Sequence, residues 1–183
     1  SSNAESIETA PIVNSVPVIF LDRHPETIAD KINVVTTDNE SAAFALTMKV
    51  IESGVSSVAV FFNADNAPSH ARKRGALRAL AETGVSEFNK SDTIHGAVGC
   101  VASSQNELIN FSKANPEVVL SGGGTFDKWI GSGLPFKRIF VCTQDFKGMA
   151  DTAVKVLMGQ FNGNGTDVKE IVRINYLSIT EPE

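Results

Sequence analysis

Six side chains stand beside short apolar stretches of the sequence, where they could bind a small ligand. They are Asp22, Arg23, Arg72, Asp127, Trp129 and Gln144. Carboxylates, a guanidinium and an amide each form paired hydrogen bonds with neighbouring hydroxyl groups, and an indole packs on the apolar face of a sugar ring. The inventory predicts a small polyhydroxylated ligand with these six residues as its contacts. For each residue the alternative is an ordinary polar strand end, and the sequence leaves both interpretations open.

Catalytic motifs find little support in the sequence. No Gly-x-Ser-x-Gly motif places a nucleophile on a sharp turn, and the sequence does not bring Asp22, Asp127 and Asp145 to one reacting group. The glycines at 122–124 are not followed by the Gly-Lys-Ser/Thr ending of a phosphate loop, so we expect a plain turn there. We therefore expect neither an enzyme nor a bound cofactor.

The histidines and cysteines do not have the spacing of a metal site. His24, His70 and His95 are isolated from one another, while Cys100 and Cys142 lie in apolar surroundings. We expect no metal, and two buried thiols rather than a disulfide.

The composition of the chain limits the kinds of partner that it could bind. The 183 residues carry a net charge of -5, with a pI of about 5.2. Binding to the phosphate backbone of nucleic acid requires clustered Lys and Arg, so a chain this acidic is a poor nucleic-acid binder by itself. The basic residues at 72–74 are better explained as a solvated helix face. No apolar run approaches the ~20 residues of a membrane span, so we expect no membrane contact.

Short apolar runs and short connections predict an α/β fold with a mainly parallel sheet flanked by helices. The expected strands are residues 17–21, 32–36, 55–62, 94–102, 116–120, 136–142 and 171–179. The expected helices are residues 39–53, 68–83, 106–114 and 146–161. Gly54 and Gly84 are expected to end the first two helices.

The clearest unit is a strand that begins at Phe136, a polar crossover at residues 143–145, and the helix that follows. One face of that helix is apolar, formed by Met149, Ala153, Val154, Leu157 and Phe161. Polar groups at the mouth of a hydrophobic strand are where an α/β sheet usually offers contacts to a ligand.

Several passages together resemble the effector-binding core of LacI-type transcriptional repressors, which shares its fold with periplasmic sugar-binding proteins. They are PVIFLDR, TDNESAAFALTMKVIESGVSSVAVFF, ARKRGALRALAETG and TFDKWIGSGLPFKRIFVCTQDFKGMADTAVKVLMGQF. Each passage alone is a loose match, and their order and spacing carry the resemblance.

The resemblance implies roles for residues at matching positions. Asp22 matches an aspartate that binds ligand hydroxyls, and Arg72 matches an arginine that commonly clamps the ligand. Asp127 matches the aspartate of a Phe-Asp strand end, and Gln144 the glutamine at a lobe crossover. Trp129 falls where some sugar-acid regulators of the family also carry tryptophan.

The chain departs from the family pattern in two places. It starts where the family's first lobe is nearly finished, so the helix-turn-helix and the early strands and helices of that lobe are expected outside this sequence. The family also has an Asn-Asp pair after a strand, then a helix, before the Phe-Asp strand. Here we expect about one strand-helix unit to be absent, and its Asn-Asp ligand group with it.

The implied fold is periplasmic-binding-protein-like, with one lobe largely complete and the other partial. Residues 1–4 look like an expression scar. Residues 35–143 are expected to form the C-terminal lobe of the effector domain. Residues 5–34 and 144–183 are expected to supply the partial N-terminal lobe and the crossover segments.

The implied function is the sensing of a small-molecule effector, a sugar, sugar acid or sugar phosphate, by a cytoplasmic transcription regulator. The family dimerises, so a homodimer is expected, and DNA would be bound only through the missing helix-turn-helix. The main alternative is the extracytoplasmic sugar-binding component of an uptake system, and a third is an unrelated α/β enzyme.

Overall fold

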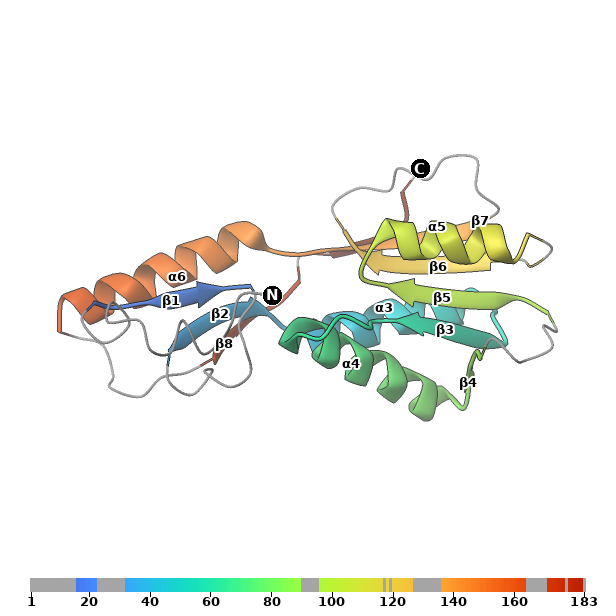
Figure 1. The fold of residues 1–183 in the computed structure, drawn as a ribbon, viewed down its shortest axis with the longest axis horizontal. Coiled ribbons are helices and arrows are strands. Elements are labelled where there is room, and N and C mark those ends of the chain that lie inside the picture. The colour runs from blue at the N-terminus through green and yellow to red at the C-terminus, as the bar shows by residue number, and fades with distance from the viewer. Residues whose placement is uncertain are drawn as a thin grey trace. The chain divides into compact units, whose positions relative to one another are not determined.

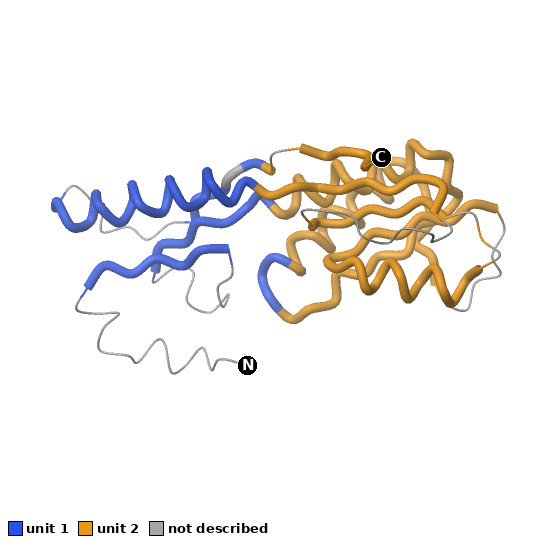
Figure 2. Tube along the Cα trace, turned by 90° about the horizontal axis from the view of Figure 1, so that it is seen from above, with its two compact units in different colours: residues 1–38, 66–68, 145–175 blue, residues 39–65, 69–144, 176–183 orange. Residues whose placement is uncertain are grey.

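A computed structural model describes residues 16–22, 32–89, 96–116, 118, 120–126, 136–163, 171–176 and 178–182. The chain divides into two compact units, which Figure 2 colours separately. Unit 1 consists of Ser1–Asp38, Asn66–Pro68 and Asp145–Asn175. Unit 2 consists of Asn39–Asp65, Ser69–Gln144 and Tyr176–Glu183. The chain therefore passes from one unit to the other after Asp38, Gln144 and Asn175, and the short segment Asn66–Pro68 adds a brief excursion into unit 1.

Unit 1 contains a three-stranded parallel sheet in the order β1-β2-β8. Its strands are β1 (Ile19–Leu21), β2 (Asn33–Thr37) and β8 (Ile171–Ile174). One helix, α6 (Phe146–Phe161), packs on β1 and β2, as Figure 1 shows. Among the described residues its buried core consists of Val35, Met149 and Ala153, with Ile19 and Val172 packed against them.

Unit 2 contains a six-stranded sheet in the order β4-β3-β5-β6-β7-β9, in which only β9 runs antiparallel to its neighbour. Its strands are β3 (Ser57–Phe61), β4 (Ser86–Glu87), β5 (Val98–Ala102), β6 (Leu120–Thr125), β7 (Phe136–Thr143) and β9 (Ser178–Thr180). Its helices are α3 (Asn39–Glu52), α4 (Ala67–Thr83) and α5 (Gln105–Ala114). The expected α/β fold with a mainly parallel sheet is confirmed.

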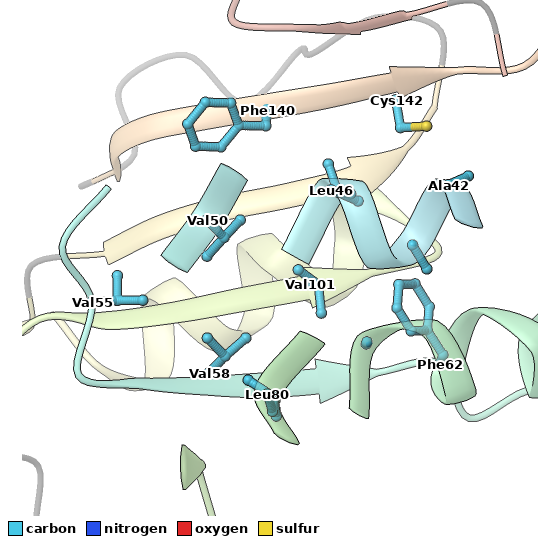
Figure 3. Packing of buried hydrophobic residues seen from close by; sticks show 12 residues of the cluster. Ala42, Leu46, Val50, Val55, Val58, Phe62, Leu80, Val101, Phe140 and Cys142 are labelled. Atoms are coloured by element: carbon cyan, nitrogen blue, oxygen red, sulfur yellow. The ribbon is translucent and has the colours of Figure 1, made fainter. Parts of the chain in front are cut away.

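Two apolar clusters fill the two faces of this sheet. On one face, Leu46 and Val50 of α3 and Leu80 of α4 pack against side chains of the strands, including Val58 and Val101 (Figure 3). On the other face, α5 packs through Leu108 and Phe111. Alternate residues of each strand face opposite sides, so the near-continuous apolar strands of the sequence are buried on both faces. Both cysteines are free and buried, as expected.

The expected glycine turn is wrong, because residues 122–124 lie within β6, a buried interior strand of the sheet. The reason is the close approach of α3 to the sheet. A Cβ atom placed on Gly123 would lie 2.9 Å from Cδ1 of Leu46 and 3.1 Å from Cγ2 of Val50. Glycine in a strand marks such close packing as well as turns. The strand expected at 116–120 is displaced toward the C-terminus, since β6 begins at Leu120.

The single strand expected at 171–179 is also wrong, because the structure contains two. β8 pairs with β2 in unit 1, whereas β9 pairs with β7 in unit 2. The end of the chain, which we expected in the partial lobe with the rest of 144–183, therefore belongs to unit 2. Strand β2 also differs from the expected division. Part of it was expected in the lobe formed by residues 35–143, but the whole strand lies in unit 1.

The apolar face expected for α6 is only half correct. Met149 and Ala153 are buried, but Val154 is 59% exposed and Phe161 is 60% exposed. Helical periodicity correctly located the helix. The buried part of that face is narrower than the apolar stripe, because the described residues of unit 1 offer α6 a sheet of three strands.

Candidate functional site

The carboxyl ends of four parallel strands lie at one edge of the sheet in unit 2. Phe61 of β3 is in register with Ala102 of β5, which is in register with Gly124 of β6, and Gly124 pairs with Val141 of β7. Residues that follow these strands are therefore brought to the same edge. Ligands of open α/β sheets bind outside such an edge.

Arg72, in the second turn of α4, lies at this edge. Its Nε donates a hydrogen bond to Oδ1 of Asn39, at 2.8 Å, in a partly buried environment. Asn39 is itself buried and begins α3. Burial raises the pKa of Cys142 in β7 to about 11, and the positive charge of Arg72 opposes part of that rise. The guanidinium is therefore close enough to the end of β7 to influence it.

Gln144 directly follows β7 and is half-buried. It is the last residue of unit 2 before the chain enters unit 1 at Asp145. Asp145 caps α6, because its Oδ1 accepts a hydrogen bond of 2.8 Å from the backbone N–H of Gly148. A Cβ atom on Gly148 would collide with that carboxylate. The cap and the glycine thus define the crossover that positions Gln144.

Asp22 directly follows β1 in unit 1 and has a left-handed backbone, with φ of 67°. Its N–H donates to the carbonyl oxygen of Val35, at 2.8 Å, and its own carbonyl accepts from Oγ1 of Thr36, at 3.0 Å. These two bonds hold an aspartate in a conformation that non-glycine residues adopt infrequently. Such backbone conformations cluster at ligand sites, which makes Asp22 a candidate on structural grounds as well.

The structure thus places Arg72 and Gln144 at one edge of unit 2 and Asp22 at the carboxyl end of a strand in unit 1. The other expected contacts, Arg23, Asp127 and Trp129, lie outside the described residues.

One candidate was missed by the sequence reasoning. Ser103 and Ser104 follow β5, and α5 and then β6 come next. That is the order in which the resembling family has its Asn-Asp pair, so the expected loss of a strand-helix unit is wrong. Ser104 caps α5 in a capping box with Glu107. Oγ of Ser103 is buried and has no hydrogen-bond partner among the described residues. The Ser-Ser pair was overlooked because neither residue matches Asn-Asp in type.

Metal and membrane chemistry find no support in the described part of the chain. No group of three histidine, cysteine or acidic side chains there could hold a metal ion. No helix of that part is both long and apolar enough to cross a bilayer.

Comparison with known proteins finds likeness in structure rather than in sequence. No protein-family model matches the chain, and no curated protein matches it. The Cra transcriptional dual regulator from Pseudomonas putida, solved in complex with fructose 1-phosphate, is similar with a TM-score of 0.72 and 17% identity; the match covers 98% of this chain and 73% of that one.

Two further solved structures show the same likeness. A LacI transcriptional regulator from Lactobacillus brevis matches with a TM-score of 0.65 and 18% identity, over 96% of this chain and 74% of that one. A periplasmic solute binding protein of an ABC transporter from Actinobacillus succinogenes, with bound D-allose, matches with a TM-score of 0.62 and 16% identity, over 98% of this chain and 72% of that one. The fold is therefore that of periplasmic-binding-protein-like and LacI-type effector domains, which confirms the expected fold.

Proposed function

We propose that this chain is the effector-binding domain of a LacI-type transcription regulator, and that its effector is a sugar, sugar acid or sugar phosphate. The observation that carries the proposal is the cluster at the carboxyl edge of unit 2. There a guanidinium is fixed by Asn39, and Gln144 follows the neighbouring end of β7. A fixed guanidinium suits a carboxylate, a phosphate or paired hydroxyls.

The proposed contacts are Asp22, Arg23, Arg72, Asp127, Trp129 and Gln144, together with Ser103. Support for a sugar-like effector comes from similar structures that hold fructose 1-phosphate and D-allose. Effector binding would shift the population of states of a longer, dimeric regulator in the cytoplasm, and an N-terminal helix-turn-helix would bind DNA. The proposed role is binding rather than catalysis.

A thermal-shift screen against sugars, sugar acids and sugar phosphates tests the proposal, because a ligand that prefers the native state raises the melting temperature. Arg72→Ala should then weaken binding of the best compound by at least ~1.5 kcal/mol, since it removes a charged hydrogen-bond donor. Arg74→Ala is the matched control, because Arg74 lies on the same helix and pairs with Glu40 on the exposed surface. Equal isotherms for Arg72→Ala and the parent, by titration calorimetry, would reject Arg72 as a contact.

The second candidate function is the sugar-binding component of an uptake system, favoured by the likeness to the solute binding protein. The sequence encoded upstream of this chain separates the two. A helix-turn-helix there supports the regulator, and a signal peptide supports the transporter component.

A further inference from the structure

The two faces of the sheet in unit 2 are covered unequally. Helices α3 and α4 both contribute to the apolar cluster on one face. Among the described residues, α5 is the only helix in the cluster on the other face. A parallel sheet normally buries both faces under helices. Beside α5, over the β3 end of the sheet, the structure has a pocket of about 580 Å³ instead.

Three aromatic rings are the largest apolar side chains that line this pocket, and Ala59, Val60 and Ala114 line it as well. The ring of Phe61 lies 5.3 Å from that of Phe111, tilted by 59°, and the ring of Phe88 lies 5.6 Å from Phe111, nearly edge-on at 81°. The volume falls within the range of small-molecule sites, about 300–1,000 Å³, which are mostly apolar with a few polar groups. None of the lining residues is among the proposed effector contacts.

The polar groups that line the pocket are acidic or neutral. They are Glu87, Glu107, Asn110 and Asn115, and no lysine, arginine or histidine is among the described residues that line it. Oε2 of Glu107 accepts hydrogen bonds from the N–H and Oγ of Ser104, at 3.1 and 3.0 Å, so this carboxylate is held in place. A carboxylate attracts a cation and disfavours an anion, and the face of an aromatic ring also attracts a cation.

We propose that this pocket is a second ligand site, independent of the proposed effector site, for a small cation with a flat apolar body, such as an aromatic amine. The aromatic rings take the apolar body, and the carboxylates of Glu87 and Glu107 take the charge. Among the described strands, β4 pairs only with Ser57 and Val58 of β3, so Ala59, Val60 and Phe61, which line the pocket, have no partner in β4.

The test compares three probes that share one ring: 2-phenylethylamine, 2-phenylethanol and phenylacetate. Each is titrated into the ¹⁵N-labelled chain and followed through amide chemical shifts. The amine should shift the amides of residues 59–61 and 110–115, with a dissociation constant about tenfold below that of the alcohol, and phenylacetate should leave them unchanged. Unchanged amides with the amine, or equal affinity for all three probes, would overturn the proposal.

Two variants at exposed positions localise the effect. Ala114→Phe, at the end of α5, should fill the pocket and abolish the shifts caused by the amine. Glu87→Gln should raise the dissociation constant of the amine about tenfold without changing that of the alcohol. The control is Glu52→Gln, because Glu52 ends α3 and pairs with Lys49 on the surface. If the chain is a dimer that Ala114→Phe converts to a monomer, the pocket holds a second copy and the proposal is wrong.

Discussion

The two units bury apolar surface to different extents. In unit 2 a six-stranded sheet lies between helices on both faces, and its clusters draw side chains from α3, α4, α5 and the strands. In the described part of unit 1, one helix packs on a three-stranded sheet, and the buried cluster has three members. The stability of unit 2 should therefore depend on packing more strongly than that of unit 1.

Helices α3 and α6 illustrate this difference in the burial of apolar surface. Both follow a polar crossover between units, and both are apolar along one side. α3 buries Leu46 and Val50 completely, whereas α6 leaves Met158 and Phe161 more than half exposed. An apolar stripe on a helix thus shows only what could be buried. The area of sheet beneath it decides how much is buried.

The largest expected effect is in the core of unit 2. Leu46 is fully buried between α3 and β6, so Leu46→Ala should lower the free energy of unfolding by about 3–5 kcal/mol through lost burial and a cavity. Urea denaturation measures it. The matched control is Val154→Ala on the exposed side of α6, which should change the free energy by less than ~0.5 kcal/mol. Similar losses for the two variants would contradict the comparison between the units.

A smaller effect is expected in the core of unit 1. Met149 is buried, and its sulfur accepts a hydrogen bond from Oγ1 of Thr37, at 3.2 Å. Met149→Ala should cost about 2–3 kcal/mol, because few other side chains share its cluster and the site can partly collapse. Amide hydrogen exchange should then accelerate in α6 and β2 but not in α3 or β5. Uniform acceleration in both units would show that they unfold as one.

The crossover into unit 1 gives the next prediction. Gly148→Val should cost about 1–2 kcal/mol, because the new side chain displaces the Asp145 carboxylate that caps α6. Thermal unfolding measures it. Gly159→Ala in the same helix is the control, since its Cβ meets nothing within 4 Å, and it should instead stabilise by about 0.5–1 kcal/mol. A melting temperature of Gly148→Val equal to that of the parent would reject the role given to this glycine.

The smallest effect concerns two surface ion pairs. The hydrogen bond from Arg138 lowers the pKa of Glu181 in unit 2, and that from Lys147 lowers the pKa of Asp151 in unit 1. A carboxyl whose pKa is lowered by folding stabilises the fold above its unfolded pKa, and this contribution is lost as the pH falls through the folded pKa. Glu181→Gln should therefore lower the urea midpoint at pH 7 but not at pH 2.

Asp151→Asn should change the midpoint less than Glu181→Gln does. Lys147 and Asp151 are four residues apart on one helix, whereas Arg138 and Glu181 are 43 residues apart in sequence. A larger change in the urea midpoint for Asp151→Asn than for Glu181→Gln would contradict this prediction.

Much of the local structure could be predicted from the sequence. The helices at 39–53, 68–83, 106–114 and 146–161 are present within a few residues of the expected bounds, and Gly54 and Gly84 follow the first two with positive φ. Of the expected contacts, Arg72 does lie at the carboxyl edge of the sheet, fixed by Asn39. The bond to Asn39 could not be predicted, because the two residues are 33 positions apart and meet only when α4 packs beside α3.

The sequence by itself determined the alternation of strands and helices and the polar crossover at residues 143–145 that precedes α6. These features depend on neighbours within a few positions, so hydrophobic period and turn chemistry are enough to specify them. Only the tertiary structure decided that the glycines at 122–124 form a buried strand and that β8 and β9 join different sheets. It also decided which part of α6 is buried. Those outcomes depend on which distant surface is available to pack against, and no local pattern encodes that surface.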